Sequence, residues 1–155
     1  MPVMEGEFLG DEQLNVKEAV GCGNILILGK DQKATLRAAS AATKAMRKIN
    51  DIILPFPNGV VRSGSKVGSR YKSLIASTND AYCPTLRGVA KQTELDEGIN
   101  NVLEIVIDGL TLESVEEAMQ VGMTAAAKPG IKKISAGNYG GGLGQYQIHL
   151  HQLTG

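Results

Sequence analysis

Glu104 has the side chain best suited to chemistry in this sequence, because it interrupts an otherwise apolar segment at 102–107. Alternation in that segment predicts a β-strand, in which successive side chains point to opposite faces. One face would carry Leu103, Ile105 and Ile107, and the other Val102, Glu104, Val106 and Asp108. Two interpretations of Glu104 remain open. Its face is either exposed to water, which leaves the carboxylate solvated, or part of a half-dry cleft, where a carboxyl group suits proton transfer.

A basic segment, residues 62–72, is a second candidate site. It is rich in glycine and serine, and no acidic residue lies between Asp51 and Asp80. Its cations are Arg62, Lys66, Arg70 and Lys72. Cations, hydroxyls and glycine amides together suit phosphate or carboxylate groups of a ligand. The alternatives are a solvated loop and a nucleic-acid-binding loop with Tyr71 as a stacking surface.

Residues 130–144 form a glycine tract, with five glycines after Ala136. Glycine has no side chain to pack and loses much conformational freedom on folding. Such a tract therefore marks either a hairpin tip or a place where backbone passes close to another group. Neither this tract nor Gly21-Cys22-Gly23 opens a helix with the spacing of a nucleotide-binding loop, so no nucleotide fold is predicted.

The histidines and cysteines give no metal signature. His149 and His151 form a His-x-His pattern for which the sequence places no third ligand, and we expect both to be exposed on a strand. Cys22 and Cys83 have neither Cys-x-x-Cys spacing nor a neighbouring histidine pair. We therefore predict no metal and no disulfide framework, and a reducing cytoplasm as the simplest location.

Composition limits the partners that this chain can bind. Its 155 residues suit one domain, and its 43% hydrophobic content provides one core of mainly aliphatic side chains. A net charge of zero gives no global field for nucleic acid or a membrane surface. The apolar runs are far shorter than the roughly 20 residues that a bilayer requires, and the N-terminus is acidic. We expect a cytoplasmic protein without a membrane span or signal peptide.

Hydrophobic periodicity predicts two strand–helix–strand units. The first has a strand at 22–28, a helix at about 31–49 and an interrupted or edge strand at 52–61. The second has a strand at 102–107, a helix that Thr111 caps and a strand at 131–136, followed by a final strand at 145–153. These units predict an α+β, ferredoxin-like split βαβ sandwich with a four-stranded sheet, two helices on one face, and extra strands or loops. Residues 1–155 would form a single lobe with its core at about 21–62 and 101–153 and a long insert at 63–100.

A set of unusual peptides is spread over nearly the whole chain. They are Pro2 to Phe8, Pro55 to Gly59, Ser63 to Lys66, Tyr82 to Pro84, Glu104 to Gly109 and Lys132 to Gly141. In kind and order this set resembles the C-terminal lobe, which we take to be the distal lobe, of formylmethanofuran:tetrahydromethanopterin formyltransferase. The resemblance implies a subunit of two ferredoxin-like lobes in a homo-oligomer, with clefts at subunit contacts that hold both coenzymes.

The reaction that the resemblance implies moves a formyl group from the amine of methanofuran to N5 of tetrahydromethanopterin, in methanogenesis and other one-carbon metabolism. No bound cofactor or metal takes part, and the two coenzymes are substrates. The family's catalytic glutamate aligns with Glu104, which would carry protons between the two amines. Motif position and the anionic coenzymes further imply contacts at Ser63, Gly64, Ser65, Lys66, Asn138, Tyr139 and Gly140.

The chain is about half as long as the resemblance implies. Met1 stands where a family chain would already have entered its second lobe. The resemblance leads us to expect an excised lobe, the product of a split gene or a truncated paralogue, with the N-terminal lobe or other subunits among its partners. Its function is formyl transfer by an enzyme lobe, or assembly and coenzyme binding by a catalytically silent one. A nucleic-acid-binding module remains a third hypothesis, against which the neutral charge argues.

Overall fold

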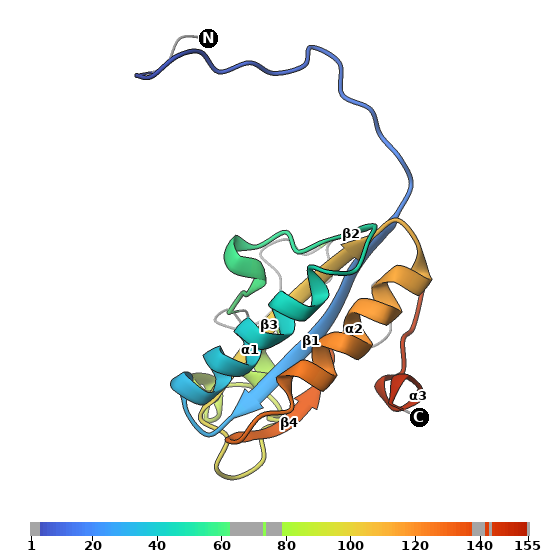
Figure 1. The fold of residues 1–155 in the computed structure, drawn as a ribbon. Helices are drawn as coiled ribbons and strands as arrows, with labels where there is room; N and C mark the ends of the chain where they lie inside the picture. The colour runs from blue at the N-terminus through green and yellow to red at the C-terminus, as the bar shows by residue number, and fades with distance from the viewer. Residues whose placement is uncertain (1–3, 63–72, 74–78, 138–141, 143, 155) are drawn as a thin grey trace.

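The computed structural model describes residues 4–62, 73, 79–137, 142 and 144–154 of the chain. Its strands are β1 (Val20–Gly29), β2 (Ile52–Ile53), β3 (Asn101–Gly109) and β4 (Ile131–Ser135). Its helices are α1 (Gln32–Met46), α2 (Leu112–Ala126) and the short α3 (Leu150–Leu153). Three 3-10 turns lie at Pro57–Gly59, Asp80–Tyr82 and Pro84–Leu86. Before β1, residues 4–19 extend away from the body of the molecule (Figure 1).

The strands form one antiparallel sheet in the order β2-β3-β1-β4. Helices α1 and α2 lie side by side on one face of this sheet (Figure 1). The four-stranded α+β architecture with two helices on one face therefore agrees with the expectation from the sequence. Among the described residues, none of the helices is long and apolar enough to cross a membrane.

The main hydrophobic core lies between the sheet and the two long helices. It contains Ile25 and Ile27 from β1 and Leu103, Ile105 and Ile107 from β3, packed against alanine and methionine side chains of α1 and α2. This confirms the face that alternation assigned to Leu103, Ile105 and Ile107. Small residues bring the layers close together, because a Cβ atom at Gly23 would lie 2.5 Å from Val115 Cγ1 of α2.

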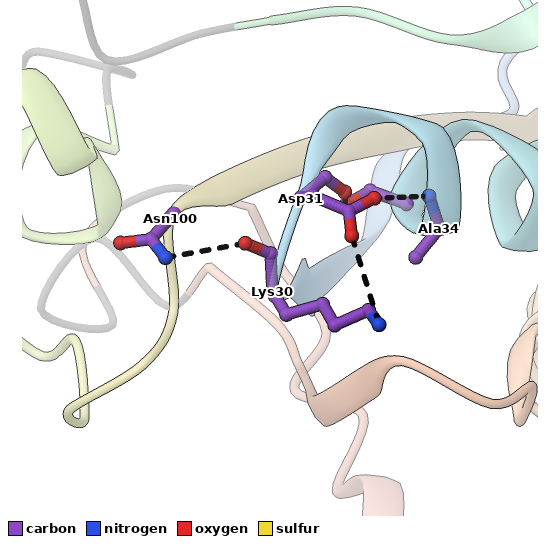
Figure 2. A network of polar contacts seen from close by, with 5 residues as sticks. Lys30, Asp31, Ala34 and Asn100 are labelled. Carbon is purple, nitrogen blue, oxygen red and sulfur yellow. Dashed lines mark hydrogen bonds and ion pairs between the residues drawn. The ribbon is translucent and has the colours of Figure 1, made fainter.

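Polar caps fix where the two long helices begin. At α1, the Asp31 carboxylate accepts the Ala34 N–H at 2.8 Å. At α2, Thr111 and Ser114 form a reciprocal capping box, which satisfies amides that the first helical turn leaves unpaired. Figure 2 shows the contacts around this cap. Lys30 Nζ lies 3.9 Å from Asp31 Oδ2, and Asn100 Nδ2 donates to the Lys30 carbonyl oxygen at 3.2 Å. The start of α1 is thereby tied to the segment that enters β3.

A second, smaller apolar cluster covers part of the sheet face opposite the helices. It contains Leu26 and Leu28 from β1 and Leu95 and Ile99 from the segment 79–100, with Tyr82 and Val102 packed against it. Backbone bonds such as Glu94 N–H to Ala81 O, at 2.9 Å, hold that segment together. Tyr82, Leu95 and Ile99 of the long insert at 63–100 therefore pack onto the sheet.

The structure corrects the expected final strand at 145–153. Residues 144–149 carry no regular secondary structure, and the chain ends in the helical turn α3. Ile148, Leu150 and Leu153 pack against the core that α2 shares, instead of adding a strand to the sheet. The spacing of Leu150 and Leu153 also suits one turn of helix, so alternation alone did not distinguish the two structures.

Two other expectations are refined rather than reversed. Helix α1 ends at Met46, and the residues up to Asp51 continue as turns. The interrupted strand at 52–61 consists of the two-residue β2, a 3-10 turn, and an isolated bridge between Val61 and Glu104. The interruption follows from Pro55 and Pro57, which cannot donate to a strand ladder.

Candidate active site

Glu104 lies in the middle of the sheet, on the face opposite the two long helices. On one side Glu104 pairs with Leu26 of β1. On the other side its backbone forms two hydrogen bonds with the backbone of Val61, of 2.8 and 2.9 Å. Only 4% of Glu104 is exposed. The structure therefore excludes the water-exposed interpretation of this carboxyl group and places it where water is largely removed.

Asn24 of β1 holds the Glu104 carboxyl group. Its side-chain Nδ2 donates to Glu104 Oε1 at 3.2 Å, and its Oδ1 accepts the backbone N–H of Gly137 at 2.8 Å. Asn24 is itself 6% exposed. Gly137 is the first of the five glycines that follow Ala136, so these bonds connect that part of the glycine tract to the candidate catalytic residue. Sequence reasoning missed Asn24, although a lone amide in an apolar strand, on the same face as Leu26, is a usable signal.

Cys22 and Asp108 continue this face toward the end of β3. Asp108 Oδ1 accepts the Cys22 N–H at 2.8 Å, where β1 has an irregularity in its pairing with β3 and Cys22 adopts a φ of 65°. Partial desolvation raises the pKa of the Cys22 thiol above its ordinary value of 9.0, and the charges of Asp108 and Glu104 raise it further. The thiol is therefore protonated at neutral pH and is a poor nucleophile.

The face thus divides into a covered apolar half and a polar half, with Glu104 at the boundary. On the covered side, the Tyr82 hydroxyl lies 3.5 Å from the Ser135 hydroxyl, and Lys133 forms a 3.7 Å ion pair with Asp96. On the other side lie Asn24, Cys22 and Asp108. A buried carboxyl group beside polar groups that continue toward the surface can exchange protons with a ligand that approaches from the polar half.

A separate hollow of about 230 Å³ opens at the edge of the sheet beside α1. Its lining residues are Gln32, Leu36, Val60, Val61, Arg62 and Leu103. Glu104 does not line it, although the Val61 backbone is common to the hollow and to the bridge with Glu104. Geometry therefore favours the opposite face of the sheet, where the polar groups converge, as the candidate site.

The expected coenzyme contacts lie outside the described residues. This holds for Ser63, Gly64, Ser65 and Lys66 of the basic segment and for Asn138, Tyr139 and Gly140 of the glycine tract. The His-x-His pair is described, and its location was predicted incorrectly. His149 and His151 flank the start of α3 rather than lying on a strand, with ring centroids 5.6 Å apart, and both are exposed as expected. The described residues include no cluster of three or more histidine, cysteine or acidic side chains arranged to hold a metal ion.

Fold and site together define an α+β lobe that presents a buried carboxyl–amide pair on the helix-free face of its sheet. The chain belongs to the family described as FTR, proximal lobe, whose model matches residues 6–153. The formylmethanofuran–tetrahydromethanopterin formyltransferase of Methylobacillus flagellatus is 57% identical over 157 residues. That of Methanothermus fervidus is 49% identical over 155 residues. Each alignment covers 99% of this chain and 52% of the relative.

Two solved structures support the same family assignment. The formyltransferase of Methanosarcina barkeri superposes with a TM-score of 0.80 at 46% identity, over 98% of this chain and 52% of that one. A formyltransferase/hydrolase complex of Methylorubrum extorquens, solved with methylofuran, gives a TM-score of 0.79 at 50% identity over 98% and 51%. This chain spans about half the length of the relatives that it matches.

The comparisons correct one expectation from the sequence. The resemblance to the formyltransferase family is confirmed, but the lobe is the proximal one and not the distal one. The order of segments along a chain does not determine which lobe is proximal, so the matching peptides could identify the family without identifying the lobe correctly.

Proposed function

We propose that this chain is the proximal lobe of an enzyme that transfers a formyl group from formylmethanofuran to N5 of tetrahydromethanopterin. The observation that carries the proposal is the buried Glu104, on a lobe that is 57% identical to the Methylobacillus flagellatus formyltransferase. The two coenzymes would be substrates, and the lobe would need no resident cofactor. A preceding lobe or neighbouring subunits would complete the cleft, since the chain spans about half of its relatives.

Proton transfer is the step for which Glu104 is suited. The N5 amine attacks the formyl carbon and forms a C–N bond, which gives a tetrahedral adduct with an oxyanion. The proton on N5 must then leave, and the nitrogen of methanofuran must gain a proton before its C–N bond breaks. A single carboxylate can accept the first proton and deliver it to the departing nitrogen, so atoms and charges balance without an external acid or base.

Two structural descriptions accompany this proposal. The sheet order β2-β3-β1-β4, with one helix after β1 and one after β3, supports a ferredoxin-like fold for the lobe. Relatives that contain a second half, and one that is part of a multi-subunit complex, support a homo-oligomer or larger assembly as the active form. The second description predicts that the isolated lobe has an incomplete cleft.

The test is a formyl-transfer assay of this chain, alone and co-expressed with the N-terminal half of the Methylobacillus flagellatus relative. We expect activity in the complemented preparation, and a loss on the order of 10²- to 10⁴-fold on Glu104→Gln, the usual contribution of a general acid–base group. Glu117→Gln, which removes an exposed carboxylate on α2, is the matched control and should retain full activity.

The outcomes distinguish the alternative functions. Full activity of Glu104→Gln would rule out the proton-transfer role. Calorimetric binding of tetrahydromethanopterin without any turnover in the complemented preparation would identify a catalytically silent lobe that binds coenzyme. Absence of both binding and turnover would leave only a role in assembly.

A further inference from the structure

The buried side-chain amide of Asn24 forms hydrogen bonds through both its nitrogen and its oxygen. Asn24 donates from Nδ2 to Glu104 Oε1 and accepts at Oδ1 from the Gly137 N–H. A primary amide has donors on its nitrogen and acceptor lone pairs on its oxygen. Turning the amide by 180° would place its oxygen against a carboxylate and its nitrogen against an N–H group. Both bonds would be lost, so the orientation of Asn24 is determined by its two neighbours.

Asn24 is placed so that its bond to Glu104 Oε1 can orient the carboxyl group. Asn24 lies on β1, which pairs with β3 on one side and β4 on the other. The residue directly opposite Glu104 is Leu26, which offers no polar atom, while Asn24 reaches the carboxyl group diagonally from two positions along the strand. Asn24 therefore orients the Glu104 head group from a strand that pairs with β3 at Asn24 itself and with β4 from Leu26 onward.

We propose that Asn24 is a positioning residue for formyl transfer. It fixes the Glu104 carboxyl group in the orientation that reaches the reacting nitrogens, and it anchors Gly137 at the same point. This inference rests on the proposed function, because one of its tests measures formyl transfer. Its other test measures the two hydrogen bonds directly and does not depend on activity. The competing explanation is that Asn24 only satisfies buried polar groups and stabilises the lobe.

Two substitutions separate these explanations because they remove different bonds. Asn24→Asp keeps an oxygen for the Gly137 N–H but replaces the donor that faces Glu104 with a carboxylate oxygen. Asn24→Leu has a similar volume and removes both bonds. A positioning role predicts that both variants lower kcat on the order of 10- to 100-fold, as small displacements of catalytic groups do, with little change in KM.

The decisive control is the same pair of substitutions in the Glu104→Gln background. If Asn24 acts through Glu104, its substitution causes no further loss of kcat there. A purely structural role predicts that each substitution lowers kcat by the same factor in both backgrounds. Asn100→Asp is the matched control. It removes the donor from an asparagine whose side chain bonds to the Lys30 carbonyl oxygen, remote from Glu104, and it should leave kcat unchanged.

A second measurement tests the geometry without relying on activity. In the ¹⁵N-labelled chain, one side-chain amide proton of Asn24 should exchange slowly with water, and Glu104→Ala should accelerate that exchange. The backbone amide of Gly137 should be protected in the wild type and in Asn24→Asp, but not in Asn24→Leu. Rapid exchange of both Asn24 side-chain protons in the wild type would overturn the inference.

These readouts distinguish failure of the inference from failure of the proposed function. An inactive wild-type preparation, or an active Glu104→Gln variant, contradicts the proposed function, and the exchange measurement then decides alone whether Asn24 orients the carboxyl group. An active, Glu104-dependent preparation in which Asn24→Asp retains full kcat contradicts the positioning role and leaves the function intact.

Discussion

Replacing Gly23 by alanine should destabilise the lobe through one identifiable contact. A Cβ atom at this position would lie 2.5 Å from Val115 Cγ1, whereas real Cβ contacts are essentially never shorter than 3.0 Å. Gly23 does not have a positive φ, so alanine would introduce no backbone strain. Val115 is fully buried and β-branched, which restricts its escape to another rotamer. Either β1 or α2 must therefore shift.

The expected size follows from two opposing effects. Forcing an extra methyl group into a packed core lowers the free energy of unfolding by about 1–3 kcal/mol. Replacing glycine also reduces the freedom of the unfolded chain, which returns about 0.4–1 kcal/mol. The net loss should be about 1–2 kcal/mol, and at about 2–4 °C per kcal/mol for a chain of this size the Tm should fall by roughly 2–8 °C.

Urea unfolding followed by circular dichroism measures this loss directly. Gly88→Ala is the control, because no heavy atom lies within 4 Å of a Cβ at that position, and we expect no destabilisation there. Combining Gly23→Ala with Val115→Ala should give a smaller loss than the sum of the single changes, since the new methyl group then occupies vacated space. Equal stability of Gly23→Ala and Gly88→Ala would refute the steric reasoning.

Three further predictions concern Cys22 and the start of α2. Because desolvation and then the charges of Asp108 and Glu104 raise the pKa of the Cys22 thiol, Asp108→Asn should accelerate its alkylation at pH 8, and an unchanged rate would contradict the electrostatic part of this account. Because the thiol pKa is higher in the folded state than in the unfolded state, the unfolded chain loses this proton first as the pH rises. The free energy of unfolding should therefore decline as the pH rises above about 9, and Cys22→Ser should remove that part of the decline. Thr111→Ala removes the capping oxygen of α2 and should lower the free energy of unfolding by about 1 kcal/mol in thermal melts. Thr124→Ala, at an exposed position of the same helix, should have a smaller effect, and equal effects would argue against the cap.

Strongly periodic elements were predictable from the sequence, and elements that depend on distant contacts were not. Alternation placed Ile105 in the core and Glu104 on the opposite face because each strand side chain must point to one side or the other. The sequence left the burial of Glu104 undecided, since burial on one face of a strand depends on which distant segments cover that face. The turn at Leu150–Leu153 was missed for the same reason, because its apolar side chains follow the surface of the core.

One of the two central residues of the candidate site could be predicted from the sequence. Glu104 was evident as a carboxyl group within an apolar strand, and a resemblance pointed to the same residue. Asn24 was not evident, because a hydrogen bond between residues 80 positions apart depends on the register of β1 against β3. Register is a property of the whole sheet, which local patterns do not specify.

The strand order also has a consequence for how the site opens. β1 is paired on both sides, whereas β4, which leads into Gly137, lies at the edge of the sheet. Edge elements undergo local unfolding at lower free energy than central ones. Transient fraying of β4 would therefore release the Gly137 amide while Asn24 and Glu104 stay in place on their two paired strands. Of the two Asn24 bonds, the one to Gly137 is therefore the one that local fluctuations should break first.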